Sequence, residues 1–206
     1  MKTRSALAQA TMNRIVDATI DAIETGGEPA LRVNDIARDS DVSVATLYHY
    51  FGDREGLVVA ARQKQYEGST GIYYEEFSRA VRNAATCVEL STVLCDFFSE
   101  ATSESSRQTR FLRAEIIGSS RTRPQLAAAL REVQEDLVGK LSVVFADAQD
   151  RGLMRTTISA RQIAEFALAI HLGSVLPDLL AGDNTTATSL DPLFSEFIDS
   201  LLVVHS

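Results

Sequence analysis

The stretch that decides the predicted fold is RVNDIARDSDVSVATLYHYF, residues 32–51. It predicts two short helices, 33–40 and 44–51, joined by a tight turn at Asp41, because Asp tolerates left-handed backbone better than most residues. Ser43 follows the turn, where its hydroxyl is placed to cap the second helix at a free amide. Small and apolar side chains between these points supply a mini-core. The pattern is that of a helix-turn-helix.

The second helix of such a motif is the one that enters the major groove of DNA. Its first residues, Val44 and Ala45, are short, so the backbone can approach the bases and a methyl group can meet thymine. Thr46 and Tyr48 follow with hydroxyls for phosphates. Arg54 lies in the first turn of the next predicted helix, where a cation opposes the helix dipole unless a phosphate lies beside it.

The longer stretch DIARDSDVSVATLYHYFGDREGL, residues 35–57, resembles the N-terminal domain of TetR-family regulators. The shared pattern is an Ile-Ala pair, a turn ending in Val-Ser, Thr-Leu-Tyr, two aromatic or His residues, Phe and a charged start to the next helix. The close resemblance covers residues 10–60, and beyond them only the layout matches. It implies backbone contacts from Thr46, Tyr48 and Tyr50, and groove-facing residues at 44, 45 and 49.

Three positions depart from the family pattern. Asp41 replaces the usual turn Gly, Arg32 replaces the usual Ser or Thr cap of the first motif helix, and Tyr50 replaces a common His, with His49 one place earlier. Arg32 adds a possible phosphate contact, and Arg54 stands where the family usually has a phosphate-binding Lys. The predicted DNA-binding residues are Arg32, Ser43, Val44, Ala45, Thr46, Tyr48, His49, Tyr50 and Arg54.

Composition limits how DNA can be bound. The 206 residues carry a net charge of −8, and the first 60 hold six basic and nine acidic residues, so contacts must come from a few placed cations. Cys87 and Cys95 are interpreted as small buried thiols, and no metal or cofactor is expected. Neither a signal peptide nor a membrane span is predicted, and low cysteine use fits a reducing cytosol, so a cytoplasmic protein is expected.

The whole chain predicts an all-α protein of about nine helices, because apolar residues recur at intervals of three and four. Residues 1–52 are predicted to form a three-helix DNA-binding domain, and residues 53–206 a larger helical domain. Gly, Ser and Pro residues mark the helix ends. The helices expected in the larger domain are 53 to about 82, 88–103, 106–118, 122–150, 159–181 and 189–204.

The resemblance implies that the larger domain binds a small-molecule effector and forms a dimer. Aromatic residues are frequent in its first half, and some of them are expected to line a pocket between helices. Ordinary core packing is the alternative for each of them, and a solvated face is the alternative for the Arg. The predicted ligand residues are Tyr66, Tyr73, Phe77, Phe97, Phe98, Phe111, Arg113 and Phe145.

The last two predicted helices suit a homodimer, because small residues among large apolar ones let helices approach closely. Two such hairpins related by a two-fold axis form a four-helix bundle. A dimer is needed to place two recognition helices in major grooves about 34–36 Å apart, or a near multiple. The predicted interface residues are Ile163, Phe166, Ala167, Ile170, Ser174, Phe194, Phe197, Ile198 and Leu201.

These features favour a ligand-responsive transcriptional regulator that binds a pseudo-palindromic operator as a dimer. Repression is the usual mode of the family, and the sequence does not decide between repression and activation. The alternative is a helical dimeric adaptor or sensor that has lost DNA binding. An enzyme is not expected, because the sequence has no Gly-rich phosphate loop, no GxSxG elbow and no metal-spaced His/Cys cluster.

Overall fold

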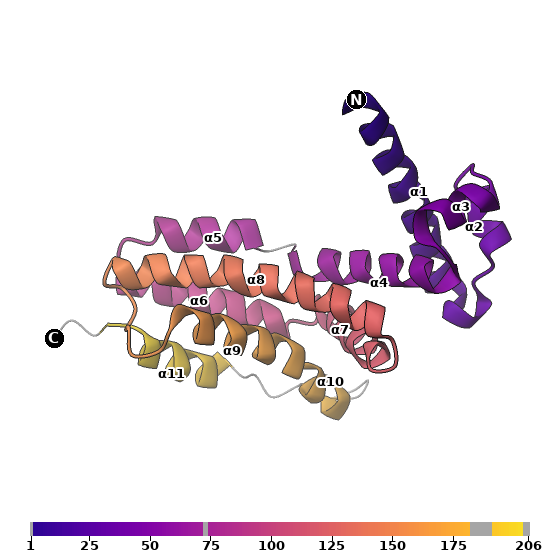
Figure 1. Cartoon of the computed structure of the whole chain (residues 1–206). Coiled ribbons are helices and arrows are strands. Elements are labelled where there is room, and N and C mark those ends of the chain that lie inside the picture. Colours follow the sequence, from indigo (N-terminus) through magenta and orange to yellow (C-terminus); the bar gives the residue numbers. More distant parts are fainter. Residues whose placement is uncertain (1, 72–73, 182–190, 204–206) are drawn as a thin grey trace. The chain divides into compact units, whose positions relative to one another are not determined.

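The computed structural model describes residues 2–71, 74–181 and 191–203, and within these ranges the chain is almost wholly helical (Figure 1). The one strand-like pairing there is an isolated bridge between Met154 and Leu202. The predicted all-α class is confirmed. The elements are α1 (Lys2–Gly26), the 3-10 helix η1 (Glu28–Ala30), α2 (Val33–Asp39), α3 (Val44–Phe51), α4 (Arg54–Gly71), α5 (Tyr74–Asn83), α6 (Cys87–Thr102), α7 (Arg107–Ser120), α8 (Pro124–Asp150), α9 (Ala160–Gly173), α10 (Val175–Ala181) and α11 (Asp191–Leu201).

Two of the stretches predicted as single helices each correspond to two elements in the described residues. The stretch predicted to continue from 53 toward 82 forms α4 and α5. The stretch predicted over 159–181 breaks at Ser174, whose amide and hydroxyl both donate to the carbonyl of Ile170. Pro177 explains this break, because it has no N–H to donate to the carbonyl one turn earlier.

The chain divides into two compact units. Unit 1 contains residues 1–68 and 119–130, and unit 2 contains residues 69–118 and 131–206. The division falls within α4, α7 and α8. The predicted boundary after residue 52 is a division by function, and it stays a prediction.

Unit 1 has a core built from α1 to α4. Ile15, Leu47 and Leu57 are fully buried there, together with Ile36 and Ala37 of α2. One face of each short helix is therefore apolar, which is what holds α2 and α3 together. Burying each of the larger aliphatic side chains contributes about 1.5–3 kcal/mol.

Unit 2 is organised around α6, which contacts α5, α9 and α11. Leu90, Leu94 and Phe98 recur at every fourth residue of α6 and are almost fully buried. Local signals in the sequence end and begin the surrounding helices as predicted. Gly152 takes a left-handed φ of 73° after α8, and Ser159 starts α9 with a capping box closed by the side chain of Gln162.

Candidate DNA-binding and effector sites

The turn of the motif has the predicted geometry. Asp41 takes the left-handed conformation with φ 53°, the one positive φ outside glycine in the described residues. The Val42 amide then donates to the carbonyl of Ala37 at 2.9 Å, which closes the turn onto α2. Ser43 caps α3, because its Oγ accepts from the amide of Thr46 at 3.0 Å. Local chemistry therefore fixes where α3 begins and how it leaves α2.

The outer face of α3 carries the predicted DNA-reading residues. Leu47 is fully buried, while Ala45, Tyr48 and His49 are exposed, with 41% of Tyr48 accessible. Tyr50 differs from them, because it is half-buried and packs against the core of unit 1. Val44 and Thr46 are half-buried, and Ser43 is exposed. Contacts of these side chains with DNA stay a prediction.

Both predicted phosphate-binding arginines bond within unit 1. Arg32 Nη1 donates to the carbonyl of Pro29 at 3.0 Å, and Arg54 Nη2 donates to the carbonyl of Glu28. As predicted, Arg32 gives α2 no side-chain cap. Their common partners are carbonyls of η1, so the same short helix orients two cations that flank the motif.

The carboxylate of Glu28 lies at the centre of an ion cluster that sequence reasoning missed. Its Oε1 is 2.8 Å from Arg62 Nε, and its Oε2 is 2.5 Å from Arg123 Nη2. Arg123 also reaches Glu55, with 3.2 Å between Nε and Oε1. Burial raises the pKa of Glu28, but the hydrogen bonds from Arg123 and Arg62 outweigh burial and hold that pKa below its ordinary value. The cluster ties η1 to α4 and to the residue before α8.

Unit 2 contains a cavity of about 390 Å³, here called the α6 pocket, which is within the size range of small-molecule sites. It is formed by α5, α6, α7 and α9, with Ser69 from the last turn of α4. Its lining residues are Ser69, Glu76, Phe77, Ala80, Val93, Asp96, Phe97, Glu100, Ser105, Ser106, Thr109, Arg110, Arg113 and His171.

Three of the predicted ligand residues, Phe77, Phe97 and Arg113, line the α6 pocket. The rings of Phe77 and Phe97 stack with centroids 4.2 Å apart, and Arg113 Nε donates to Ser69 Oγ at 3.2 Å. These three come from α5, α6 and α7. The sequence could not show that these three helices converge on one cavity.

The other predicted ligand residues lie elsewhere. Phe98 and Phe145 are almost fully buried in the core of unit 2, as the packing alternative expected. Tyr66 is buried in unit 1. Phe111 is exposed and lines a second, shallow hollow. Tyr73 lies outside the described residues.

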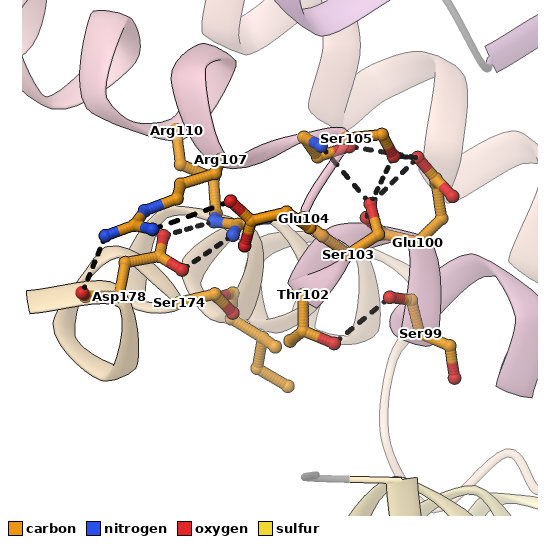
Figure 2. Close-up of polar contacts among 12 residues, drawn as sticks. Ser99, Glu100, Thr102, Ser103, Glu104, Ser105, Arg107, Arg110, Ser174 and Asp178 are labelled. Carbon is orange, nitrogen blue, oxygen red and sulfur yellow. Dashed lines mark hydrogen bonds and ion pairs between the residues drawn. The ribbon is translucent and has the colours of Figure 1, made fainter. Parts of the chain in front are cut away.

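Arg110, one of the lining residues of the pocket, forms a buried ion pair (Figure 2). Arg110 Nε and Nη2 donate to the two oxygens of Asp178 at 2.7 and 2.8 Å, and Arg110 Nη1 donates to the carbonyl of Ser103 at 2.8 Å. Only 3% of the Arg110 side chain and 11% of the Asp178 side chain are exposed. The pair neutralises Arg110 and joins α7 to α10.

The neighbouring Glu100 is held by serine hydroxyls (Figure 2). Its Oε1 accepts from Ser103 at 3.1 Å, from Ser105 at 3.2 Å and from Ser106 at 3.0 Å. These three contacts fix the orientation of the carboxylate. The polar residues that follow α6 therefore not only end the helix but also hold the Glu100 side chain in place.

His171 enters the pocket from α9. Its Nδ1 lies 2.8 Å from the carbonyl of Ala167, and because a carbonyl can only accept, Nδ1 carries the proton. Burial lowers the pKa of His171 to about 4, and the charges of Arg113 and Arg110 add to this lowering. The ring is therefore neutral near pH 7, and it packs against Phe97 with centroids 4.6 Å apart.

Most of the predicted dimer residues are buried within unit 2. Ile163, Ala167, Ser174, Phe194, Ile198 and Leu201 are buried. Phe166 is 48% exposed and contacts the half-buried Phe197, with ring centroids 5.0 Å apart, and Ile170 is also half-buried. Phe166 and Phe197 therefore mark the outward apolar surface of α9 and α11, and the interface stays a prediction.

Other features of the described residues bear on the expected site chemistry. Cys87 and Cys95 form no disulfide, and both are half-buried, whereas full burial was expected. No group of three or more His, Cys, Asp or Glu residues in the described ranges is placed to hold a metal ion. None of the described helices is long and apolar enough to cross a membrane.

A capped, exposed helix that follows a left-handed turn on a small helical unit defines a helix-turn-helix DNA-binding protein. Family comparison agrees. Residues 15–61 match the model of bacterial regulatory proteins of the tetR family, and residues 89–203 match that of the BetI-type transcriptional repressor C-terminal domain. The second match alone spans more than half of the chain. The chain belongs to the TetR family and is a transcriptional regulator.

Individual relatives share the layout at low identity. The chain is 24% identical over 176 residues to the HTH-type transcriptional regulator UidR of Escherichia coli K12, and the match covers 85% of each chain. A transcriptional regulator from Saccharomonospora viridis in complex with choline has a TM-score of 0.61 at 15% identity, covering 96% of this chain and 100% of that one. FadR of Bacillus subtilis in complex with stearoyl-CoA has a TM-score of 0.57 at 16% identity, covering 90% and 96%.

Proposed function

We propose that this regulator is a repressor that binds a pseudo-palindromic operator as a homodimer and leaves it when a small molecule occupies the α6 pocket. The observation that carries the proposal is that one chain holds both a capped, exposed α3 and a formed pocket in unit 2. The relatives bound to choline and stearoyl-CoA support a small-molecule effector. Because those ligands differ greatly in charge and size, they do not indicate its class. Because such a repressor acts on chromosomal DNA, we expect it in the cytoplasm, associated with the nucleoid.

Release follows if the effector moves α4. Ser69 in the last turn of α4 lines the pocket and accepts from Arg113, while Arg54 in the first turn of α4 bonds to the carbonyl of Glu28. An effector that displaces Arg113 from Ser69 changes the contacts at the last turn of α4, the helix whose first turn carries Arg54. Such coupling needs the effector to prefer the released state by about 1–3 kcal/mol.

The test is binding of the purified protein to the DNA upstream of its own coding region, by fluorescence anisotropy across a salt series. Arg32 and Arg54 give a dimer four predicted phosphate contacts, so the slope of log K against log salt is expected near about −4. Arg54→Ala should reduce that slope by about 2, and Tyr48→Phe should weaken binding at every salt concentration. Arg131→Ala, an exposed cation of α8, is the matched control and should change neither.

The homodimer is tested separately by analytical ultracentrifugation. Phe166→Glu places a charge on the outward apolar surface of α9 and should yield monomers, while Glu165→Gln beside it should leave the dimer intact. A folded dimer that binds no DNA at about 50 mM salt, even after selection from random sequences, would favour the alternative of an adaptor that has lost its DNA role. Monomers at every concentration would contradict the dimer.

A further inference from the structure

The α6 pocket has an uneven balance of charge. Three carboxylates and two guanidinium groups line it, and Asp178 neutralises one guanidinium, that of Arg110. Carboxylates therefore outnumber the remaining cation, Arg113, by three to one. Glu76 and Asp96 are exposed at the pocket and have no ion pair within the described part of the chain. This balance favours a positively charged guest and opposes an anion.

Glu100 is the carboxylate best prepared to meet a cation. Its Oε1 is occupied by three serine hydroxyls, whereas no hydrogen bond to Oε2 is formed within the described residues. Figure 2 shows the second oxygen on the side away from the serines. One oxygen thus fixes the group, and the other is left to accept from a ligand. A carboxylate held in place loses little entropy when it binds.

An aromatic wall lies on the same side of α6. Val93, Phe97 and Glu100 are spaced by four and three residues, so they share one helix face. Phe97 is half-buried, with Phe77 stacked on it and His171 packed against it. His171 is neutral near pH 7 because its pKa is about 4, so it does not repel a cation. Aromatic faces beside carboxylates are the surroundings in which proteins bind organic ammonium groups.

We propose that the α6 pocket binds an organic ammonium compound, with its cationic group at Glu100 and its apolar body against Phe97. The inference rests on the proposed function, in that it names the class of effector for the same pocket. Asp96 and Glu76 draw the cation toward the pocket. Arg113, bonded to Ser69, faces the uncharged part of the ligand, and its displacement links binding to α4.

The test uses three compounds that share one skeleton: 4-phenylbutylammonium, 4-phenylbutyrate and 4-phenylbutanol. Isothermal titration calorimetry on the full-length protein without DNA measures each affinity. The ammonium compound is expected to bind at least about tenfold more tightly than the carboxylate, because charge-assisted hydrogen bonds are roughly twice as strong as neutral ones. Raising the salt concentration should weaken the ammonium compound only.

Variants locate the binding groups. Glu100→Gln keeps an oxygen for the serine hydroxyls but removes the charge, so the ammonium affinity should fall about tenfold with little change in melting temperature. Asp96→Asn alters an exposed side chain without a bonded partner and should cost about two- to fivefold. Phe97→Leu should weaken the ammonium compound more than the alcohol. Glu132→Gln, an exposed carboxylate on α8 away from the pocket lining, should alter none of these affinities.

The outcomes separate this inference from the proposed function. Equal or tighter binding of 4-phenylbutyrate overturns it, as does an ammonium affinity that Glu100→Gln leaves unchanged. Absence of ammonium binding up to about 10 mM, from protein that still binds its operator, also overturns it while the regulator stands. If the ammonium compound binds selectively but leaves the operator affinity unchanged, the ligand class proposed here is supported. The same result contradicts the proposed release of DNA by an effector.

Discussion

Replacing Asp178 by Asn should destabilise unit 2 strongly, because it leaves the Arg110 guanidinium charged, buried and unbalanced. Asn has nearly the same shape, keeps one carbonyl oxygen and puts an amide where Arg110 now donates at 2.7 or 2.8 Å. With only 3% of the Arg110 side chain exposed, water cannot replace the lost charge. Breaking a buried pair from one side costs about 3–5 kcal/mol.

The exposed pair Glu135–Arg161 provides the matched control. Arg161 Nη2 donates to both Glu135 oxygens at 3.0 and 3.2 Å, but 51% and 60% of the two side chains are exposed. Glu135→Gln makes the same chemical change on the surface and should cost no more than about 1 kcal/mol.

The measurement is thermal unfolding followed by circular dichroism at one fixed protein concentration, since the proposed dimerisation would make the melting temperature depend on concentration. Asp178→Asn should lower the melting temperature by about 10 °C, and Glu135→Gln by less than about 4 °C. The double variant Arg110→Met with Asp178→Leu should regain most of the loss, because an apolar pair leaves no unbalanced charge. Equal effects of the two single variants, or no recovery in the double variant, would refute the reasoning.

Three further predictions concern single residues. The pKa of His171 is about 4 in the folded chain and near 6.5 in the unfolded chain, so the unfolded state binds the proton first as the pH falls. The free energy of unfolding should therefore decrease by up to about 3 kcal/mol between pH 7 and pH 4. In urea titrations, the His171→Gln variant should lose less stability over that pH range. Asp41→Gly removes the backbone strain of an Asp in the left-handed conformation and removes a negative charge close to the proposed DNA contacts. Both the melting temperature and the operator affinity should therefore rise, and an unchanged melting temperature would show that the turn carries no strain. Glu28→Gln should lower the free energy of unfolding, measured in urea, by about 2–3 kcal/mol. The control Asp17→Asn, which breaks the exposed pair of Asp17 with Lys64, should lower it by no more than about 1 kcal/mol. Equal losses in the two variants would argue against a buried cluster.

The sequence predicted the DNA-binding motif well because its structure depends on neighbours along the chain. The cap from Ser43 to Thr46 spans three residues, and the left-handed position of Asp41 is a property of that residue type in a turn. The start of α9 at Ser159 follows from the same kind of signal. Such features can be inferred without knowing what packs on them.

The pocket and the outward apolar surface of α9 and α11 depend on contacts between residues far apart in the chain, so the sequence alone could not resolve them. Phe97 and Phe98 are adjacent, yet one lines the pocket and the other is buried in the core, because α5, α9 and α11 approach α6 from different sides. The stripes on α9 and α11 were interpreted as an interface, but a periodic pattern cannot distinguish burial against the same chain from burial against a second one. The partner of Arg110 lies 68 residues away, at Asp178.

The ion cluster around Glu28 has a consequence for how this protein can exchange parts with its relatives. Residues 119–130, which bring Arg123 and the buried Leu126, belong to the same compact unit as residues 1–68. A chimera that joins the first 68 residues to a foreign sensor therefore takes only part of the recognition module. To keep unit 1 intact, recombination would have to transfer two separate gene segments together. We therefore expect such a regulator to change its ligand specificity by substitutions within its pocket more readily than by exchange of its whole sensor region.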